Sequence, residues 1–256
     1  MRFLLAVALA AIAAAAGGAG IPPEARRSGY DFASPEIRAM QDDDTVNPGM
    51  LWVSQGEGLW ATKPGAAARS CQDCHGDAGK SMKGVAARYP AFDAVLGRPI
   101  DLEQRINVCR SEHQQTEPFA WESEDLLALT AFIARQSRGV PIAVENSPEL
   151  RPFFELGGKL FHQREGQLNL SCSQCHDDNW GKRLAGNVIP QAHPTGYPVY
   201  RLEWQSLGSL QRRLRNCMTG VRAEPYGYGA PEMVALELYL MQRARGMAVE
   251  TPAVRP

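Results

Sequence analysis

The sequence predicts an all-α fold in which two tandem helical units follow a signal peptide. Three observations support this prediction. Two five-residue cysteine motifs of the same form lie roughly one hundred residues apart, the segments after them resemble each other, and helix start and stop signals recur in both halves. We expect residues 1–19 to be the signal peptide, residues 20–147 the first unit and residues 148–256 the second.

The first twenty residues have the pattern of a secretory signal peptide. Arg2 precedes an apolar run from Phe3 to Ala16, and small residues follow the run. This run is shorter and richer in alanine than the roughly 18–20 strongly apolar residues that a membrane span needs. We therefore expect cleavage between Ala16 and Gly20, export to the periplasm, and a mature protein without a membrane span.

The charge of the chain argues against nucleic acid as a partner. The sequence carries 27 basic and 28 acidic residues, which give a formal net charge of -1. A nucleic-acid-binding protein needs a clustered basic face, and neither the net charge nor the spacing of basic residues indicates one.

Four of the six cysteines predict two covalently attached haem groups. They lie in two CxxCH motifs, CQDCH at Cys71–His75 and CSQCH at Cys172–His176. In this motif both thiols add to the vinyl groups of haem c, and the adjacent histidine binds the iron. Three disulfides and a zinc site are the alternatives, but the paired motifs and the lack of usual zinc-ligand spacing disfavour both. The predicted attachment residues are Cys71, Cys74, Cys172 and Cys175, and the predicted axial histidines are His75 and His176.

The internal repeat continues after the motifs. Leu102–Cys109 (LEQRINVC) matches Leu210–Cys217 (LQRRLRNC), and Leu127–Gly139 matches Val234–Gly246. Each unit reads as helix, haem motif, loop, helix ending in cysteine, loop and helix. The sequence therefore predicts two cytochrome c-like haem domains in tandem.

The last helix of each unit has clear sequence signals. Ser123 can cap a helix whose first turn carries Glu124 and Asp125, and Pro231 suits the first turn of the corresponding helix. Apolar residues at helical spacing are expected in the core or the haem wall: Leu126, Leu129, Ile133, Leu236 and Leu240. Three prolines are expected to mark the linker: Pro141, Pro148 and Pro152.

Cys109 and Cys217 stand at equivalent places in the repeat, where a cytochrome c unit commonly offers its second axial ligand. An electron-transfer cytochrome usually offers methionine there, whereas a thiolate donates more electron density and should lower the potential. We expect thiolate ligation at both irons. The alternatives are a disulfide between Cys109 and Cys217, or ligation by Met218, His193 or His113.

Basic residues surround Cys217. Arg213 precedes it by four residues, so both lie on one helix face, and a guanidinium fork suits a sulfur oxyanion. Arg105 precedes Cys109 in the same way, so this position also fits a residue that stabilises a thiolate or a haem propionate. The other arginines that can approach Cys217 are Arg212, Arg215, Arg222, Arg243 and Arg245, and a glycine-rich loop at 224–229 can leave the thiol accessible.

These features together resemble the SoxA family, the dihaem subunits of SoxAX cytochromes. The resemblance rests on the two CxxCH motifs with a cysteine after each, on RRLRNCMTGVRAEP from Arg212, and on the helix ends QSRG and RARG. It implies L-cysteine S-thiosulfotransferase activity, in which thiosulfate is joined oxidatively to a cysteine of the SoxYZ carrier. Two electrons would pass through haem to a c-type cytochrome, and a monohaem SoxX would complete a heterodimer.

The resemblance also implies residue roles. Cys217 would ligate the active-site haem iron and could carry a persulfide, while Arg213 and Arg243 would bind the anionic substrate. The first haem would be peripheral. The alternative functions are a dihaem electron carrier without substrate chemistry, which predicts methionine or histidine on at least one iron, and a haem-based sensor, which predicts an output domain.

Overall fold

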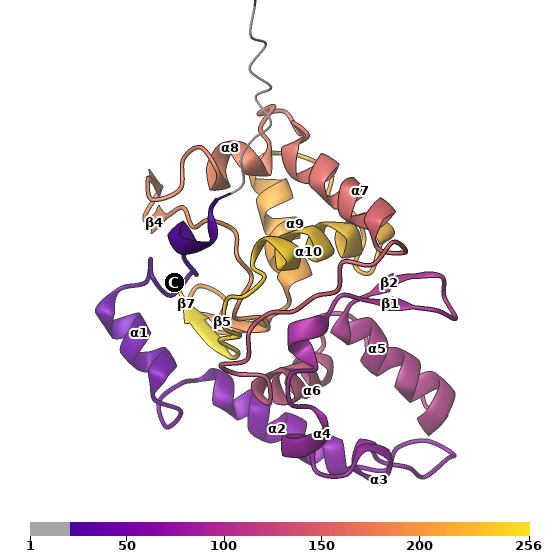
Figure 1. Ribbon diagram of the computed structural model, residues 1–256. Helices are drawn as coiled ribbons and strands as arrows, with labels where there is room; N and C mark the ends of the chain where they lie inside the picture. The colour runs from indigo at the N-terminus through magenta and orange to yellow at the C-terminus, as the bar shows by residue number, and fades with distance from the viewer. Residues whose placement is uncertain (1–20) are drawn as a thin grey trace, which may run out of the picture.

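Helices in two similar sets form most of the regular secondary structure in the described chain, as the sequence predicts (Figure 1). The computed structural model describes residues 21–256, so the predicted signal peptide lies outside the described residues. No helix within residues 21–256 is long and apolar enough to cross a bilayer. The helices are α1 (Pro35–Asp42), α2 (Gly49–Ala61), α3 (Cys71–His75), α4 (Ala78–Ser81), α5 (Leu102–Cys109), α6 (Glu124–Arg135), α7 (Arg151–His162), α8 (Cys172–His176), α9 (Leu210–Gly220) and α10 (Pro231–Arg243).

Short strands, which the all-α prediction did not include, precede the helix of each non-motif cysteine. Antiparallel hairpins stand directly before α5 and α9, and the second hairpin gains β7 as a parallel neighbour of β5. The strands are β1 (Ala91–Asp93), β2 (Arg98–Ile100), β3 (Arg183–Leu184), β4 (Asn187–Val188), β5 (Val199–Arg201), β6 (Ser206–Gly208) and β7 (Ala253–Arg255). Each of these strands has only two or three residues, so the helical class is unchanged.

Side-chain caps fix the helices that carry the chemistry. Ser70 and Ser171 cap α3 and α8, and each forms a reciprocal capping box with the third residue of its helix. Ser123 accepts a hydrogen bond from the Leu126 backbone and caps α6, as predicted. Pro152, predicted to lie in the linker, instead lies in the first turn of α7, where proline costs no hydrogen bond.

The same close helix crossing holds each unit together. In the first unit α2 crosses α6, and a Cβ placed on Gly56 would lie 2.1 Å from the carbonyl oxygen of Ala128. In the second unit α7 crosses α10, and a Cβ on Gly157 would lie 2.1 Å from the carbonyl oxygen of Ala235. Glycine is therefore required at both crossings because the backbones touch. The five apolar residues predicted to line the core are all buried: Leu126, Leu129, Ile133, Leu236 and Leu240.

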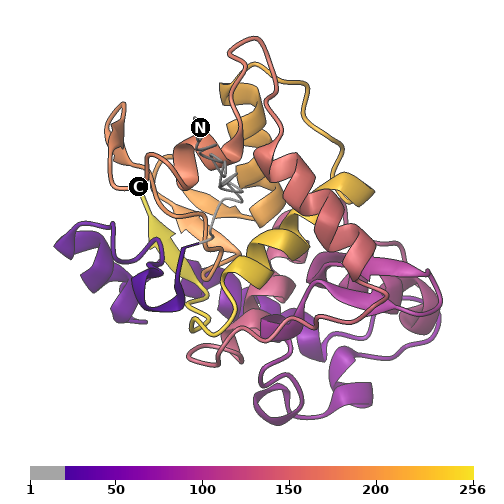
Figure 2. The ribbon, with the colours of Figure 1, turned by 45° about the horizontal axis from the view of Figure 1, so that its top comes forward.

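The two units share their cores rather than meeting at a polar surface. Tyr200 and Leu207 of the second hairpin and Val254 of β7 pack into the cluster formed by α2 and α6. In return, Ala87 of the first unit packs in one cluster with Leu238 of α10. Both views show β7, in yellow, beside the indigo segment that contains α1 (Figures 1 and 2). Removing either unit would therefore expose apolar surface of the other.

Candidate functional site

A pocket in the first unit brings together three of the predicted haem residues. Cys71 and His75 of α3 and Cys109 of α5 line an open pocket of about 1140 Å³. The rest of its wall is largely apolar and includes Trp60, Met82, Leu102, Ile106, Leu129 and Ile133. Cys74, the other thiol of the motif, is exposed on α3.

A second pocket brings His176 and Cys217 together. It has about 1020 Å³ of open space and is lined by residues of β5, α9 and the segment 187–197. The His176 ring donates from Nδ1 to the backbone oxygen of Pro190 at 2.7 Å, which leaves Nε2 as the ring nitrogen for the contact with Cys217. A backbone acceptor of this kind fixes the tautomer and orientation of a metal-binding histidine.

The residues of both pockets fit haem c. Each is lined by the imidazole of a CxxCH helix, a further cysteine and apolar side chains. Cys71 also lines the first pocket, whereas Cys172 and Cys175 are half-buried on α8 outside the lining of the second. All six cysteines are unpaired within the described residues, so the motif thiols are available for attachment. Cys109 and Cys217 line different pockets, which disfavours the disulfide between them.

The rival ligands differ in their positions. Met218 packs in the core cluster of the second unit, together with Leu160 and Phe161. His113 is exposed in the π-helical turn that follows Cys109. His193 does line the second pocket, but its Nδ1 lies 2.9 Å from the backbone oxygen of Arg27, and burial lowers its pKa to about 4.

The two non-motif thiols differ in acidity. Burial raises the pKa of Cys109 above its ordinary value, and the positive charge of Arg105 only partly opposes this. Burial acts in the same direction on Cys217, but a hydrogen bond with His176 and the charges of Arg213 and Arg201 together lower its pKa. The thiol of Cys217 is therefore more acidic than that of Cys109 before any metal is considered.

Arg213 and Arg243, the two predicted substrate-binding arginines, lie in different environments. Arg213 is half-buried in the pocket wall with Cys217. Arg243 forms an ion pair with Asp177 at 2.5 Å and packs over the ring of Phe161, outside the lining of that pocket. Arg213 therefore lies in the pocket wall with Cys217, whereas Arg243 is paired with Asp177, the residue that follows His176.

The other arginines singled out by the sequence have partners elsewhere. Arg212 stacks on Trp204, with its guanidinium carbon 4.2 Å from the ring centroid. Arg215 donates to the backbone oxygen of Tyr226 in the glycine-rich loop. Arg222 and Arg245 are both exposed, and Arg105 forms an ion pair with Asp93 in the first unit.

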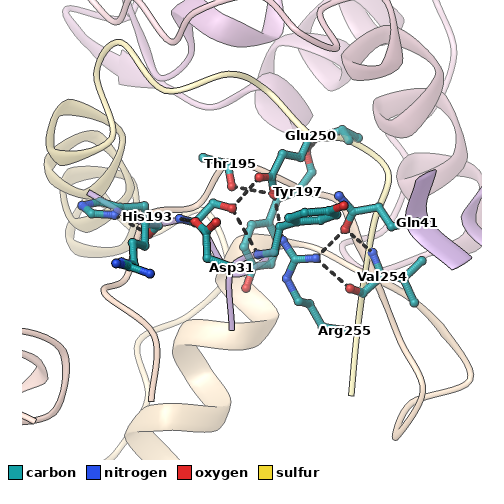
Figure 3. A network of polar contacts seen from close by, with 12 residues as sticks. Asp31, Gln41, His193, Thr195, Tyr197, Glu250, Val254 and Arg255 are labelled. Carbon is teal, nitrogen blue, oxygen red and sulfur yellow. Dashed lines mark hydrogen bonds and ion pairs between the residues drawn. The ribbon is translucent and has the colours of Figure 1, made fainter. Parts of the chain in front are cut away.

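Sequence reasoning missed two arginines of the second pocket, Arg201 and Arg255. Both line it, but neither is near Cys217 in the sequence. Arg255 belongs to a network that joins the two ends of the described chain: it donates to Gln41 and, at 2.8 Å, to Glu250 (Figure 3). The guanidinium of Arg255 is therefore engaged by these partners. The position of Arg201 in the pocket wall depends on the strand register, which was not predictable from the sequence.

Comparisons with known proteins show what the whole chain is similar to. A family model described as SoxA/TsdA, cytochrome c domain, matches residues 55–142 and 156–249. The chain is 41% identical over 242 residues to the L-cysteine S-thiosulfotransferase subunit SoxA of Pseudaminobacter salicylatoxidans, covering 94% of this chain and 85% of that one. It is 34% identical to the same subunit of Rhodovulum sulfidophilum, covering 90% and 80%. The crystal structure of SoxXA from P. pantotrophus superposes with a TM-score of 0.87 and 32% identity, covering 90% of this chain and 87% of that one.

Proposed function

Because this chain belongs to the SoxA family of c-type cytochromes, we propose that it catalyses the oxidative attachment of thiosulfate to a cysteine of a SoxYZ carrier protein. The relatives at 41% and 34% identity carry the name L-cysteine S-thiosulfotransferase subunit SoxA. Cys217, His176 and Arg213 around one pocket are the observation that supports this function most directly. A thiolate, a metal-binding imidazole and a cation are the groups that the chemistry requires.

The reaction sets three demands on the site. A carrier thiol and thiosulfate form one S–S bond, release one proton and give up two electrons. The dianion must be held by cations, the proton needs an acceptor, and the electrons need a path away. Haem bound in the pocket supplies the one-electron redox chemistry, and a c-type cytochrome is the proposed final acceptor.

We assign one haem c to each pocket, as a cytochrome c domain requires covalent haem. The first haem would be attached at Cys71 and Cys74, with His75 and Cys109 as axial residues. The second would be attached at Cys172 and Cys175, with His176 and Cys217 as axial residues. The hydrogen bond from His176 to Pro190 holds the imidazole in the orientation that this role needs.

The chain's own residues would prepare the substrate side of the second pocket. Arg213 lies in the wall with Cys217 and supplies a guanidinium for the oxygen atoms of thiosulfate. The positive charge of Arg213 also contributes to lowering the pKa of the Cys217 thiol. The role of Arg243 in substrate binding stays a prediction, because its guanidinium is paired with Asp177.

The proposed partners follow from the same family relation. A solved relative at 32% identity is a SoxXA complex, so we propose a heterodimer with a monohaem SoxX-type cytochrome. An adjacent haem would give two electrons a route out of the pocket. A periplasmic location, with removal of the predicted signal peptide, fits covalent haem attachment and a thiosulfate substrate.

Paired arginine variants test the substrate role. In the heterodimer supplied with SoxYZ, Arg213→Ala should lower kcat/KM for thiosulfate by roughly 10- to 150-fold, since one charge-assisted contact to an anion is lost. Arg213→Lys should recover only part of this, because an ammonium keeps the charge but loses the fork. Steady-state kinetics over a range of thiosulfate concentrations measures the effect.

Arg105→Ala is the matched control, since Arg105 holds the equivalent place before Cys109. It should leave the thiosulfate dependence unchanged. If both alanine variants perturb only the spectrum of their own haem and neither alters thiosulfate kinetics, the substrate role of Arg213 is wrong. A native heterodimer that transfers electrons but never consumes thiosulfate would favour the plain electron carrier.

A further inference from the structure

Asp93 in the first unit and Arg201 in the second occupy the same place in the repeat. Each is the last residue of the first strand of its hairpin, and each stands equally far before its non-motif cysteine. Both side chains are buried, with 6% of Asp93 and 8% of Arg201 exposed. The position that carries a buried negative charge in the first unit therefore carries a buried positive charge in the second.

In the first unit, Asp93 neutralises the arginine of the following helix. Its carboxylate forms an ion pair with Arg105 and accepts hydrogen bonds from the backbone N–H groups of Val95 and Leu96, at 2.9 and 2.8 Å. Arg105 therefore already has an anionic partner in the protein, and the pocket beside Cys109 gains no surplus charge from this pair.

In the second unit, the residues equivalent to Asp93 and Arg105 are both arginines, and their guanidinium groups lie in one pocket wall. Arg201 and Arg213 both line the pocket that contains Cys217. The Nε of Arg201 donates to Glu203 at 2.8 Å, but the Glu203 side chain is 45% exposed and does not line the pocket. Within residues 21–256, no ion pair or side-chain hydrogen bond engages the guanidinium of Arg213. The N–H donors of the Arg213 guanidinium, and those of Arg201 other than Nε, are therefore left for an anion in the pocket to accept.

We propose that Arg201 is an anion-binding residue that forms, with Arg213, a two-guanidinium site beside Cys217. At this place in the repeat, aspartate neutralises the helix arginine of the first unit, whereas arginine adds a second guanidinium to the pocket of the second unit. The ligand is a group with two or more anionic oxygens. Where that group is thiosulfate, the inference rests on the proposed function and deepens it.

A carboxylate of the haem held in the same pocket offers the same chemistry as the oxygens of thiosulfate. The two sources predict different measurements on the haem-loaded heterodimer. If Arg201 binds thiosulfate, Arg201→Gln should raise the Kd of thiosulfate, and of unreactive sulfate, about 10-fold or more, while the midpoint potential of the second haem stays unchanged. If Arg201 binds the haem carboxylate, the potential should shift and both Kd values should stay. Calorimetry measures the Kd values, and a redox titration measures the midpoint potential of the second haem.

Variants of neighbouring residues separate this role from a structural one. Arg201→Lys should recover part of whichever property is lost, because it keeps the charge. Glu203→Gln should strengthen anion binding, since it removes the carboxylate that competes for Arg201. If Arg201 serves only as the partner of Glu203, Arg201→Gln and Glu203→Gln should lower the free energy of unfolding by similar amounts. Both variants should then leave the Kd of thiosulfate and sulfate unchanged. Asp93→Asn, at the equivalent place in the first unit, should leave the Kd of thiosulfate as it is.

The inference is overturned if Arg201→Gln alters neither anion affinity nor the potential of the second haem in a folded heterodimer that consumes thiosulfate normally. Failure of the proposed function gives a different result. In that case the native heterodimer itself would not consume thiosulfate, whereas sulfate affinity and the haem potential would still report on Arg201.

Discussion

Two cysteines at equivalent places in the repeat lie in pockets with different charge. Near Cys109 the helix arginine is neutralised by a carboxylate, and near Cys217 it is joined by a second arginine. Burial raises the pKa of Cys109, whereas the hydrogen bond and charges around Cys217 outweigh burial and lower its pKa. The second thiol is thus better prepared to act as an anionic ligand or a sulfur nucleophile.

At the residue scale, we expect thiolate ligation at both irons. Electron paramagnetic resonance of the native heterodimer should show two thiolate-ligated low-spin signals from this chain, because Cys109 and Cys217 each line a pocket with an axial histidine. Cys217→Met should remove one signal and keep the other, since a thioether is a weaker donor. Cys109→Met is the matched variant and should remove the other signal. An unchanged spectrum in Cys217→Met would exclude this residue as a ligand.

Residues that act through local spacing were predictable from the sequence, and residues that act across the fold were not. The CxxCH motifs and the position of Arg213 one helical turn before Cys217 depend on neighbours in the chain. Arg201 reaches the same pocket from a strand, and Arg243 is held by an ion pair with Asp177. Those placements depend on hairpin register and helix packing, which the sequence alone did not specify.

At the element scale, the helix crossing of each unit depends on one glycine. Gly56 and Gly157 allow the backbones of α2 and α6, and of α7 and α10, to touch. Because the crossing sets where the following CxxCH helix begins relative to the last helix, it also sets the walls of the haem pocket. The predicted helices were recognisable from caps and apolar periodicity, whereas the two- and three-residue strands are too short to produce a pattern.

Two glycines of the same helix provide a stability test of this crossing. Gly56→Ala should lower the free energy of unfolding by about 1–3 kcal/mol, since its Cβ would overlap the Ala128 carbonyl. Gly58→Ala should raise it by about 0.5–1 kcal/mol, because a Cβ there meets no atom within 4 Å and alanine favours the helix. Denaturant unfolding followed by circular dichroism measures both. If both variants change the free energy of unfolding in the same direction, the close backbone contact at Gly56 is contradicted.

At the scale of the whole molecule, buried carboxyl groups lie where the two units meet. Burial raises the pKa of Asp101 to about 7 and that of Glu103 to about 8, and it also raises the pKa of Glu237 on α10. Asp101 accepts a hydrogen bond from Gln211 of α9 at 2.8 Å, so residues of both units contribute to the cluster. Glu122 and Arg98 are the other charged groups that act on it.

These groups make stability depend on pH. Their pKa values are higher in the folded chain than in the unfolded chain, so the folded state binds more protons. Stability should be greatest below about pH 4 from this contribution and should fall as pH rises through about 7 to 8. Glu237→Gln should flatten this fall by about 1 kcal/mol or more between pH 5 and pH 8, since an amide needs no proton to stay neutral. Thermal unfolding at several pH values measures it.

Glu57→Gln, on the exposed face of α2, is the matched control and should keep the native dependence on pH. If Glu237→Gln and the native protein lose stability in parallel as pH rises, then Glu237 does not contribute to the pH dependence and the prediction is wrong.

The shared core also sets the order in which the chain can be completed during synthesis and export. Val254 of β7 packs in the cluster built by α2 and α6, and its backbone N–H donates to Gln41. The first unit therefore cannot complete its core until residue 254 has emerged. Loss of β7 would loosen the core of the first unit and would also remove Ala253 and Arg255 from the wall of the second pocket.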